Sequence, residues 1–274
     1  MFFSRILLTL MVSGASVDGG TLPPAGAPAA LIAAPVVDAG VPAVVVDAGV
    51  AKVPLAPPVK VLVDRVQAFY EKTTDFQADF KQEYTYKAFK RTQVSTGKVT
   101  FKKPGLMRWE YEKPSPKTFV LAGDRVFAHD PEAKLVTRAA INTNQLSASV
   151  TFLFGVGKLE NEFNIVQTTC AKCVGTQLEM TPLVPDSRFK KIYLEVDPTT
   201  AQVLKSTVID PDGSENAISF IGLKANVGIN EAHFKITPPP GTQVQDFLTG
   251  AKTSVPSATK SAGEPGGAVD AGAR

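Results

Sequence analysis

Short segments in which apolar and polar residues alternate recur through the middle of the chain, and this feature constrains the fold most. The first is FQADFKQEYTYK, residues 76–87, in which apolar and aromatic side chains share one face: Phe76, Ala78, Phe80, Tyr84 and Tyr86. Because successive side chains of a strand point to opposite sides, the pattern predicts a β-strand with one dry and one wet face. Similar runs, bounded by turn residues, follow at 94–102, 106–112, 117–122, 125–129, 135–138, 162–167, 176–181, 188–196, 203–209 and 217–223.

Short, closely spaced strands with tight turns indicate an antiparallel meander of about eleven strands. A single sheet of that size curls under its own twist, so it has a concave side that needs cover. Two segments with apolar residues at helical spacing, one beginning at Val59 and one over 142–155, predict helices for that side. The predicted fold class is therefore mainly β with helices.

The two ends of the chain differ in composition from the middle. Residues 1–15 contain Arg5, a short apolar run and a small-residue cleavage pattern, which predicts a secretory signal peptide; an uncleaved N-terminal anchor is the alternative. Residues 16–58 are rich in Ala, Val and Pro and contain no aromatic residue, so we expect a disordered linker. The tail 248–274 has the same composition, which leaves 59–247 as one folded, exported domain.

The composition and motifs leave few chemical functions open. The formal net charge of +3 is too small for the basic surface of a nucleic-acid-binding protein, and the two histidines are too isolated to predict a metal site. The segment Asp210-Pro-Asp-Gly213 lacks the ligand offsets of a calcium loop and is typical of a hairpin turn. No catalytic constellation is recognisable, so we expect no enzyme, no catalytic residue and no cofactor.

Cys170 and Cys173 lie between two predicted strands. In an exported protein this pair predicts a local disulfide that staples the turn. The alternatives are a redox motif, which would need a helix N-terminus after Cys170, and a zinc site, which would need two further ligands.

The strand at 106–112 contains the only tryptophan of the chain and places Met107, Trp109 and Tyr111 on one face. That face continues an aromatic surface on the neighbouring predicted strands, formed by Phe76, Phe80, Tyr84, Phe101 and Phe119. Such a surface usually fills a core. Here a curled sheet covered by two short helices encloses more space than the helices fill, which favours a binding surface for an apolar ligand. The basic residues nearby, Lys102, Lys103 and Arg108, are typical of a solvated strand face.

Three stretches of this sequence resemble the LolA family in their order and spacing: DFQADFKQEY, GKVTFKKPGLMRWEYEKPSPKTFVLAGDRVFAHDP and HFKITPPPGTQV. The resemblance spans roughly residues 61–244, and its most specific parts are 103–109 and 234–239. It implies an unclosed antiparallel β-barrel of about eleven strands with a helical lid. It also implies a periplasmic chaperone that carries lipoproteins from the inner to the outer membrane, with the eight residues of the aromatic surface binding acyl chains.

The resemblance further implies partners and a role for one basic residue. The partners would be acylated lipoproteins, an inner-membrane lipoprotein-releasing transporter and an outer-membrane acceptor, and we expect the carrier to be a monomer. LolA proteins commonly have an arginine at the position of Lys103, which is linked to lid contacts and cargo transfer; lysine keeps the charge but loses the planar fork. An envelope sensor, or a carrier of another lipid or glycolipid with the same fold, remains the alternative function.

Overall fold

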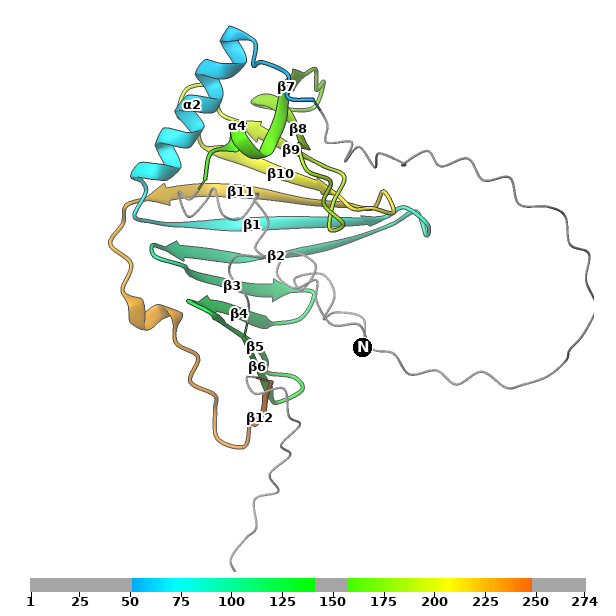
Figure 1. Cartoon of the computed structure of the whole chain (residues 1–274). Helices are drawn as coiled ribbons and strands as arrows, with labels where there is room; N and C mark the ends of the chain where they lie inside the picture. The colour runs from blue at the N-terminus through cyan, green and yellow to red at the C-terminus, as the bar shows by residue number, and fades with distance from the viewer. Residues whose placement is uncertain (1–50, 141–156, 248–274) are drawn as a thin grey trace, which may run out of the picture.

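The computed structural model describes residues 51–140 and 157–247, in which one twelve-stranded sheet dominates (Figure 1). The helix predicted over 142–155 lies outside these residues. The strands are β1 (Asp75–Tyr86), β2 (Arg91–Lys102), β3 (Leu106–Lys113), β4 (Lys117–Ala122), β5 (Arg125–Asp130), β6 (Leu135–Ala140), β7 (Phe163–Thr168), β8 (Thr176–Pro182), β9 (Lys191–Val196), β10 (Val203–Ile209), β11 (Glu215–Ala225) and β12 (Gln243–Asp246).

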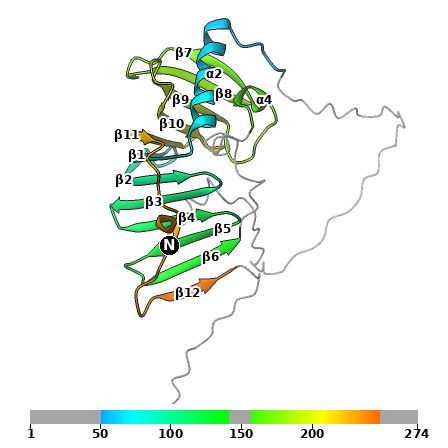
Figure 2. The same cartoon turned by 90° about the vertical axis from the view of Figure 1, so that its left-hand side faces the viewer.

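The order of the strands in the sheet is β12-β6-β5-β4-β3-β2-β1-β11-β10-β9-β8-β7. The first hairpins, β2–β6, therefore lie on one side of β1, and the later ones, β7–β11, on the other. Figures 1 and 2 show that the sheet curls without closing, since its edge strands β7 and β12 lie at opposite ends of the molecule. The mainly β, unclosed fold predicted from the sequence is confirmed.

The eleven predicted strands correspond to β1–β11, and the prediction misses β12. All four residues of β12 are exposed, so no alternation of apolar side chains marks this strand in the sequence. The strand β12 also pairs in parallel with β6, whereas all pairs of neighbouring strands among β1–β11 are antiparallel.

The helix α2 (Pro57–Lys72) covers the concave side of the half-sheet β7–β11 (Figures 1 and 2). Its buried stripe follows the predicted helical spacing: Val59, Leu62, Val63, Val66, Gln67 and Tyr70. Polar contacts add to this packing, because both terminal nitrogens of Arg65 donate to the carbonyl oxygens of Pro198 and Thr199 at 2.6 Å. The short helix α4 (Leu159–Glu162) lies beside α2 and precedes β7.

After β11 the chain crosses the convex face of the sheet and forms the 3-10 helix η3 (Glu231–Phe234) against β3 and β4. The side chains of Lys102 and Arg108 hold this segment: Lys102 Nζ donates to the Ile229 carbonyl oxygen at 2.7 Å, and Arg108 Nη1 to that of His233 at 3.1 Å. The prediction of a solvated face is therefore wrong for these two residues. Their charges satisfy backbone carbonyls of a segment that lies on the sheet.

The linker predicted over 16–58 ends earlier than its composition suggests. The helix α2 begins at Pro57, and prolines suit the first helical positions because the N–H that they lack has no partner there. Before it, Val53 N donates to Asn164 Oδ1 at 2.8 Å, Asn164 Nδ2 donates to the Ala51 carbonyl oxygen at 2.9 Å, and Leu55 packs against the core. Residues 51–58 thus belong to the folded domain.

These contacts predict different effects for two deletions within the mature chain. Removal of residues 16–50 should leave the melting temperature nearly unchanged, because their composition offers nothing to bury. Removal of 16–58 should lower it by several degrees, since Leu55, the Asn164 hydrogen bonds and the first helical residues are lost. Calorimetry on both variants checks this; equal melting temperatures would show that residues 51–58 contribute no stability.

Candidate functional site

Five of the predicted acyl-binding residues form one cluster on the concave face of β1–β3, and we call it the concave-face cluster: Phe76, Phe80, Phe101, Met107 and Trp109. Strand register brings them together, since Phe76 pairs with Phe101 and Phe101 with Met107. The rings of Phe76 and Phe101 stack with centroids 5.1 Å apart, and the ring of Phe80 meets Trp109 edge-on at 4.9 Å. Such pairs are more favourable than their buried area alone would give.

Gly97 on β2 allows this arrangement, and sequence reasoning missed it. It pairs with Phe80, and a Cβ at this position would lie 1.9 Å from the carbonyl oxygen of Glu110 and 3.0 Å from the Phe80 ring. Only a glycine lets strand β3 approach so closely while the Phe80 ring lies across the backbone. The alternating pattern of β2 with a glycine in its middle is the signal that could have indicated it.

The concave-face cluster is closed in this conformation. The exposed fractions of the side chains are 2% for Phe76, 1% for Phe80, 0% for Phe101, 3% for Met107 and 7% for Trp109. Tyr111 and Phe119 pack at the edge of the cluster and are half-buried. Tyr84, predicted to belong to the same surface, lies outside the cluster, where its hydroxyl donates to Asp210 Oδ2 at 2.6 Å. An acyl chain would therefore have to displace covering groups rather than enter an open space here.

The concave face becomes polar toward the β1–β2 turn. Gln82 is buried; its Nε2 donates to Asn216 Oδ1 at 2.8 Å and its Oε1 accepts from the Tyr111 hydroxyl at 3.0 Å. Burial raises the pKa of Tyr111, so its hydroxyl stays a neutral donor. The concave side of β1 thus runs from purely apolar at Phe76 to hydrogen-bonding at Gln82. Sequence reasoning assigned no role to Gln82 or Asn216.

Lys103 fastens the C-terminal end of α2 to the β2–β3 turn. Its Nζ donates to the carbonyl oxygens of Tyr70 at 2.7 Å and Glu71 at 2.9 Å. Carbonyls in the last turn of a helix have no partner within the helix, and a cation there also interacts favourably with the helix dipole. Burial lowers the pKa of Lys103. The structure therefore places Lys103 in contact with the helix that covers the sheet.

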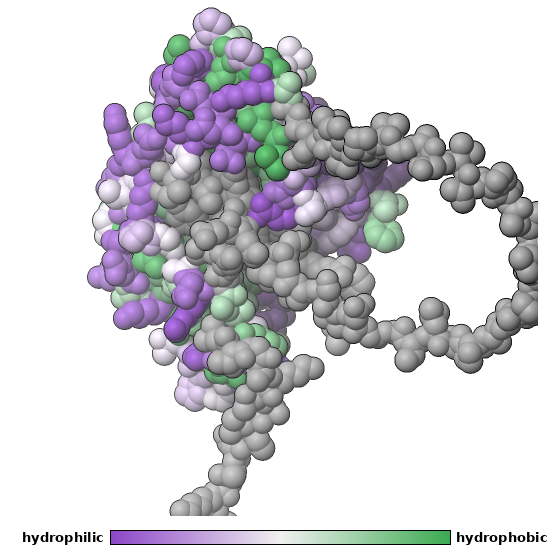
Figure 3. All heavy atoms as spheres, in the orientation of Figure 1, coloured by the Kyte–Doolittle hydropathy of each residue, from purple (hydrophilic) through white to green (hydrophobic). Residues whose placement is uncertain are grey.

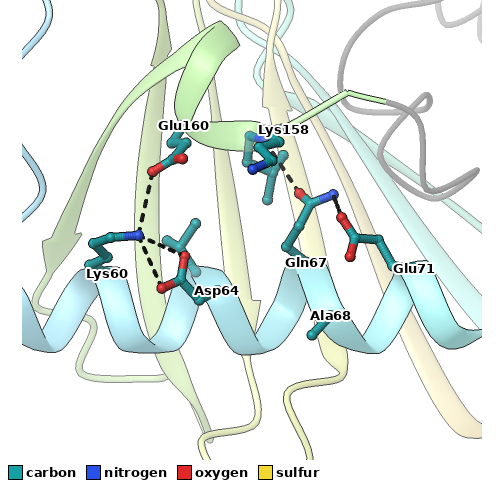
Figure 4. Close-up of a pocket in the computed structure, with 9 residues that line it drawn as sticks. Lys60, Asp64, Gln67, Ala68, Glu71, Lys158 and Glu160 are labelled. Carbon is teal, nitrogen blue, oxygen red and sulfur yellow. Dashed lines mark hydrogen bonds and ion pairs between the residues drawn. The ribbon is translucent and has the colours of Figure 1, made fainter.

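A small cavity of about 230 Å³ lies between α2 and α4 (Figure 4). Figure 4 shows charged and amide side chains around it, with Lys60 pointing to Asp64 and Glu160 and with Gln67 pointing to Glu71. Gln67 also joins α2 to the chain before α4, because its Nε2 donates to the Gly157 carbonyl oxygen at 3.0 Å. This polar lining does not suit an acyl chain. The Gln67 hydrogen bond, like those of Lys103, holds α2 in place.

A larger cavity of about 630 Å³ lies on the convex face, beneath the segment that leads to η3. Its lining is mixed, with Asp79, Lys98, Glu110 and His233 among the polar side chains and Val227 among the apolar ones. Neither cavity is lined by a member of the concave-face cluster.

Cys170 and Cys173 form a disulfide in the β7–β8 connection, with Cα atoms 5.4 Å apart. Within residues 51–140 and 157–247, no three His, Cys, Asp or Glu residues gather in a way that would hold a metal ion. In the same ranges, no helix combines the length and the apolar character that crossing a membrane requires.

The family model described as "Outer membrane lipoprotein carrier protein LolA" matches residues 71–237, which is more than half of the chain. The chain belongs to the LolA family. This LolA-family chain is 29% identical over 182 residues to the outer-membrane lipoprotein carrier protein of Dechloromonas aromatica, covering 66% of this chain and 86% of that one. It is 27% identical over 188 residues to the protein of the same name from Nitrosospira multiformis, covering 66% and 87%.

Among solved structures, a LolA superfamily protein from Nitrosomonas europaea superposes on 65% of this chain and 97% of its own. The TM-score is 0.37 and the sequence identity 10%, so family membership rests on the sequence matches rather than on this looser superposition.

Replacing Lys103 by methionine in this LolA-family chain should loosen the last turn of α2, because the Tyr70 and Glu71 carbonyls lose a charged donor. We expect the free energy of unfolding to fall by about 1–2 kcal/mol, and amide hydrogen exchange at residues 69–73 to become faster. Lys103→Arg is the matched control and should retain most of the protection. Unchanged exchange in Lys103→Met would contradict the fastening.

Proposed function

We propose that this protein is a periplasmic carrier that shields the acyl chains of lipoproteins against the concave-face cluster. The observation that carries the proposal is a cluster of aromatic and aliphatic side chains on the concave face of an unclosed sheet. Membership of the LolA family and the names of its relatives support it. The predicted signal peptide and the disulfide Cys170–Cys173 fit an oxidising compartment outside the cytoplasm.

The chemistry of the cluster suits an acyl chain. Each CH₂ removed from water contributes ~0.8 kcal/mol, so a few long chains supply a large driving force without any directional bond. Flat aromatic rings and the flexible Met107 side chain adapt to chains that bend in different ways. The total binding free energy is then large, but it does not depend on the exact structure of the acyl chains, which suits a carrier of many lipoproteins.

The helix α2 meets the cluster at its C-terminal end, where the rings of Tyr70 and Phe76 lie 6.5 Å apart, so uptake next to Phe76 requires this end of α2 to move away from the sheet. The polar contacts that oppose this movement include those of Arg65 to the β9–β10 turn, of Gln67 to Gly157 and of Lys103 to the end of the helix, and the Tyr70 hydroxyl also accepts from Val203 N. Apolar packing of the α2 stripe adds to them, and an acyl chain that takes the place of this stripe restores the lost burial. The free energies of the two packings then differ little, so loading and release are reversible.

The polarity of the concave face sets the direction in which a lipoprotein would lie. The methyl ends of the chains suit the end formed by Phe76, Phe101 and Met107, which are all buried in the hydrophobic core. The ester and amide groups that join the chains to the lipoprotein suit the Gln82, Asn216 and Tyr111 end, where hydrogen-bonding atoms are available. The polypeptide of the lipoprotein would leave at that end.

The partners follow from this function. A carrier that takes lipoproteins from the inner membrane needs a transporter that releases them and an acceptor at the outer membrane. We expect it to act as a monomer, since it presents one concave face for each cargo molecule.

Neighbouring residues of β4 provide a matched pair of variants. Phe119 lies on the concave face opposite Trp109, and Thr118 lies on the convex face; both are half-buried. Phe119→Glu should weaken binding of a triacylated lipopeptide by at least about tenfold, because a charge replaces apolar contact. Thr118→Glu should change it by less than about twofold, since that side chain points away from the cargo.

Both variants would be compared with the parent protein by lipopeptide titration and by denaturant unfolding. Equal weakening of binding by the two substitutions, or none from Phe119→Glu in a folded protein, would show that the acyl chains bind elsewhere. The unfolding curves separate a loss of binding from a loss of the fold.

A further inference from the structure

The β1–β2 hairpin tip, residues 86–91, combines an exposed aromatic side chain with three basic side chains and no acidic one. Phe89 is 78% exposed, and Lys87, Lys90 and Arg91 are exposed beside it. The sequence between Glu83 and Lys98, YTYKAFKRTQVSTG, contains no acidic residue. In Figure 1 this hairpin reaches beyond the neighbouring strands, and Figure 3 shows hydrophobic and hydrophilic side chains side by side at that end.

Ring contacts and a hydrogen bond hold the hairpin tip in place. Tyr86 and Arg91 form the last strand pair, and the rings of Tyr84 and Tyr86 lie 4.5 Å apart, followed by Phe89 at 6.4 Å from Tyr86. The β10–β11 turn braces the same hairpin, because Ser214 Oγ accepts from Lys87 N at 3.2 Å. Phe89 thus lies beyond the last strand pair, against the Tyr86 ring, and remains exposed.

Three carboxylates near the hairpin tip accept hydrogen bonds within the protein, and a fourth, Glu215, pairs with Thr85 and is exposed. Glu83 Oε1 accepts from Lys81 Nζ at 2.9 Å, Asp210 accepts from Tyr84, and Asp212 accepts from Ser214. No ion pair joins the three tip cations to any residue of 51–140 or 157–247. Three positive charges around one exposed aromatic ring are complementary to a surface that is anionic and has an apolar layer beneath its charges.

We propose that the hairpin tip docks the protein on the surface of an anionic phospholipid bilayer. Phe89 enters the boundary between headgroups and acyl chains, while Lys87, Lys90 and Arg91 remain at the level of the phosphates. One aromatic side chain and three cations give weak, reversible attachment, which lets the protein leave again. The tip is at the Gln82 end of β1, opposite Lys103, so docking brings the polar end of the concave face toward the membrane. This surface is distinct from the acyl-binding face, and its test does not depend on cargo.

The experiment is sedimentation of the mature full-length protein with vesicles, using phosphatidylcholine alone or with about 30% phosphatidylglycerol. We expect binding to the anionic vesicles only, weakening as salt is added because exposed charges are screened. Lys87→Gln with Lys90→Gln should reduce the partition coefficient about 25-fold, at about fivefold for each charge. Phe89→Ser should reduce it by about tenfold.

Matched controls are available at the other end of the molecule. Lys72→Gln with Lys224→Gln removes two exposed lysines near the opposite end of β1, and Val174→Ser removes an apolar side chain that is 92% exposed. Both controls should bind like the parent protein. The proposal is overturned if the parent protein binds neither kind of vesicle, if it binds both equally, or if the controls weaken binding as much as the tip substitutions.

Discussion

The pairing of β1 with β11 holds the structure together, because it joins the two series of hairpins into one curled sheet. Asp75 fixes the end of this pairing: its carbonyl oxygen accepts from Asn226 N at 2.7 Å, and its buried carboxylate accepts from the backbone of Val227, Gly228 and Ile229. Several N–H donors satisfy this carboxylate without a countercharge. At the same point α2 ends and the chain leaves β11 for the convex face. The lid, the sheet and the convex segment thus meet at one residue.

The sequence predicts those parts of this arrangement that depend on local patterns. Alternation identifies β1–β11, and it places Phe76, Phe80 and Trp109 on one face, because burial on one side of a strand leaves that mark. It does not reveal β12, whose residues are all exposed, or the roles of Lys102 and Arg108, whose partners are backbone carbonyls more than a hundred residues away. Tyr84 has the right spacing for the cluster but hydrogen-bonds to Asp210, and neither spacing nor composition encodes such a long-range partner.

The candidate site combines two requirements that conflict. A surface able to hold acyl chains would expose large aromatic side chains to water when empty, which costs free energy and promotes aggregation. In this conformation the concave-face cluster is covered, and α2 is held by the hydrogen bonds of Arg65, Gln67 and Lys103. Hydrogen bonds exchange readily with water, so they define the closed position of the helix without making it permanent. In the proposed function, the protein without cargo is thereby protected, and the cargo competes mainly with apolar packing.

The single tryptophan of the chain allows a direct test of where the acyl chains bind. Trp109 belongs to the concave-face cluster, and bromine atoms on an acyl chain quench tryptophan fluorescence only on close contact. The measurement is a titration of the protein with a triacylated lipopeptide carrying brominated chains, alongside the same lipopeptide without bromine. Binding of the acyl chains against the concave-face cluster predicts saturable quenching of Trp109 by the brominated ligand alone. Binding of both ligands with no difference in quenching would place the chains away from the concave face and contradict it.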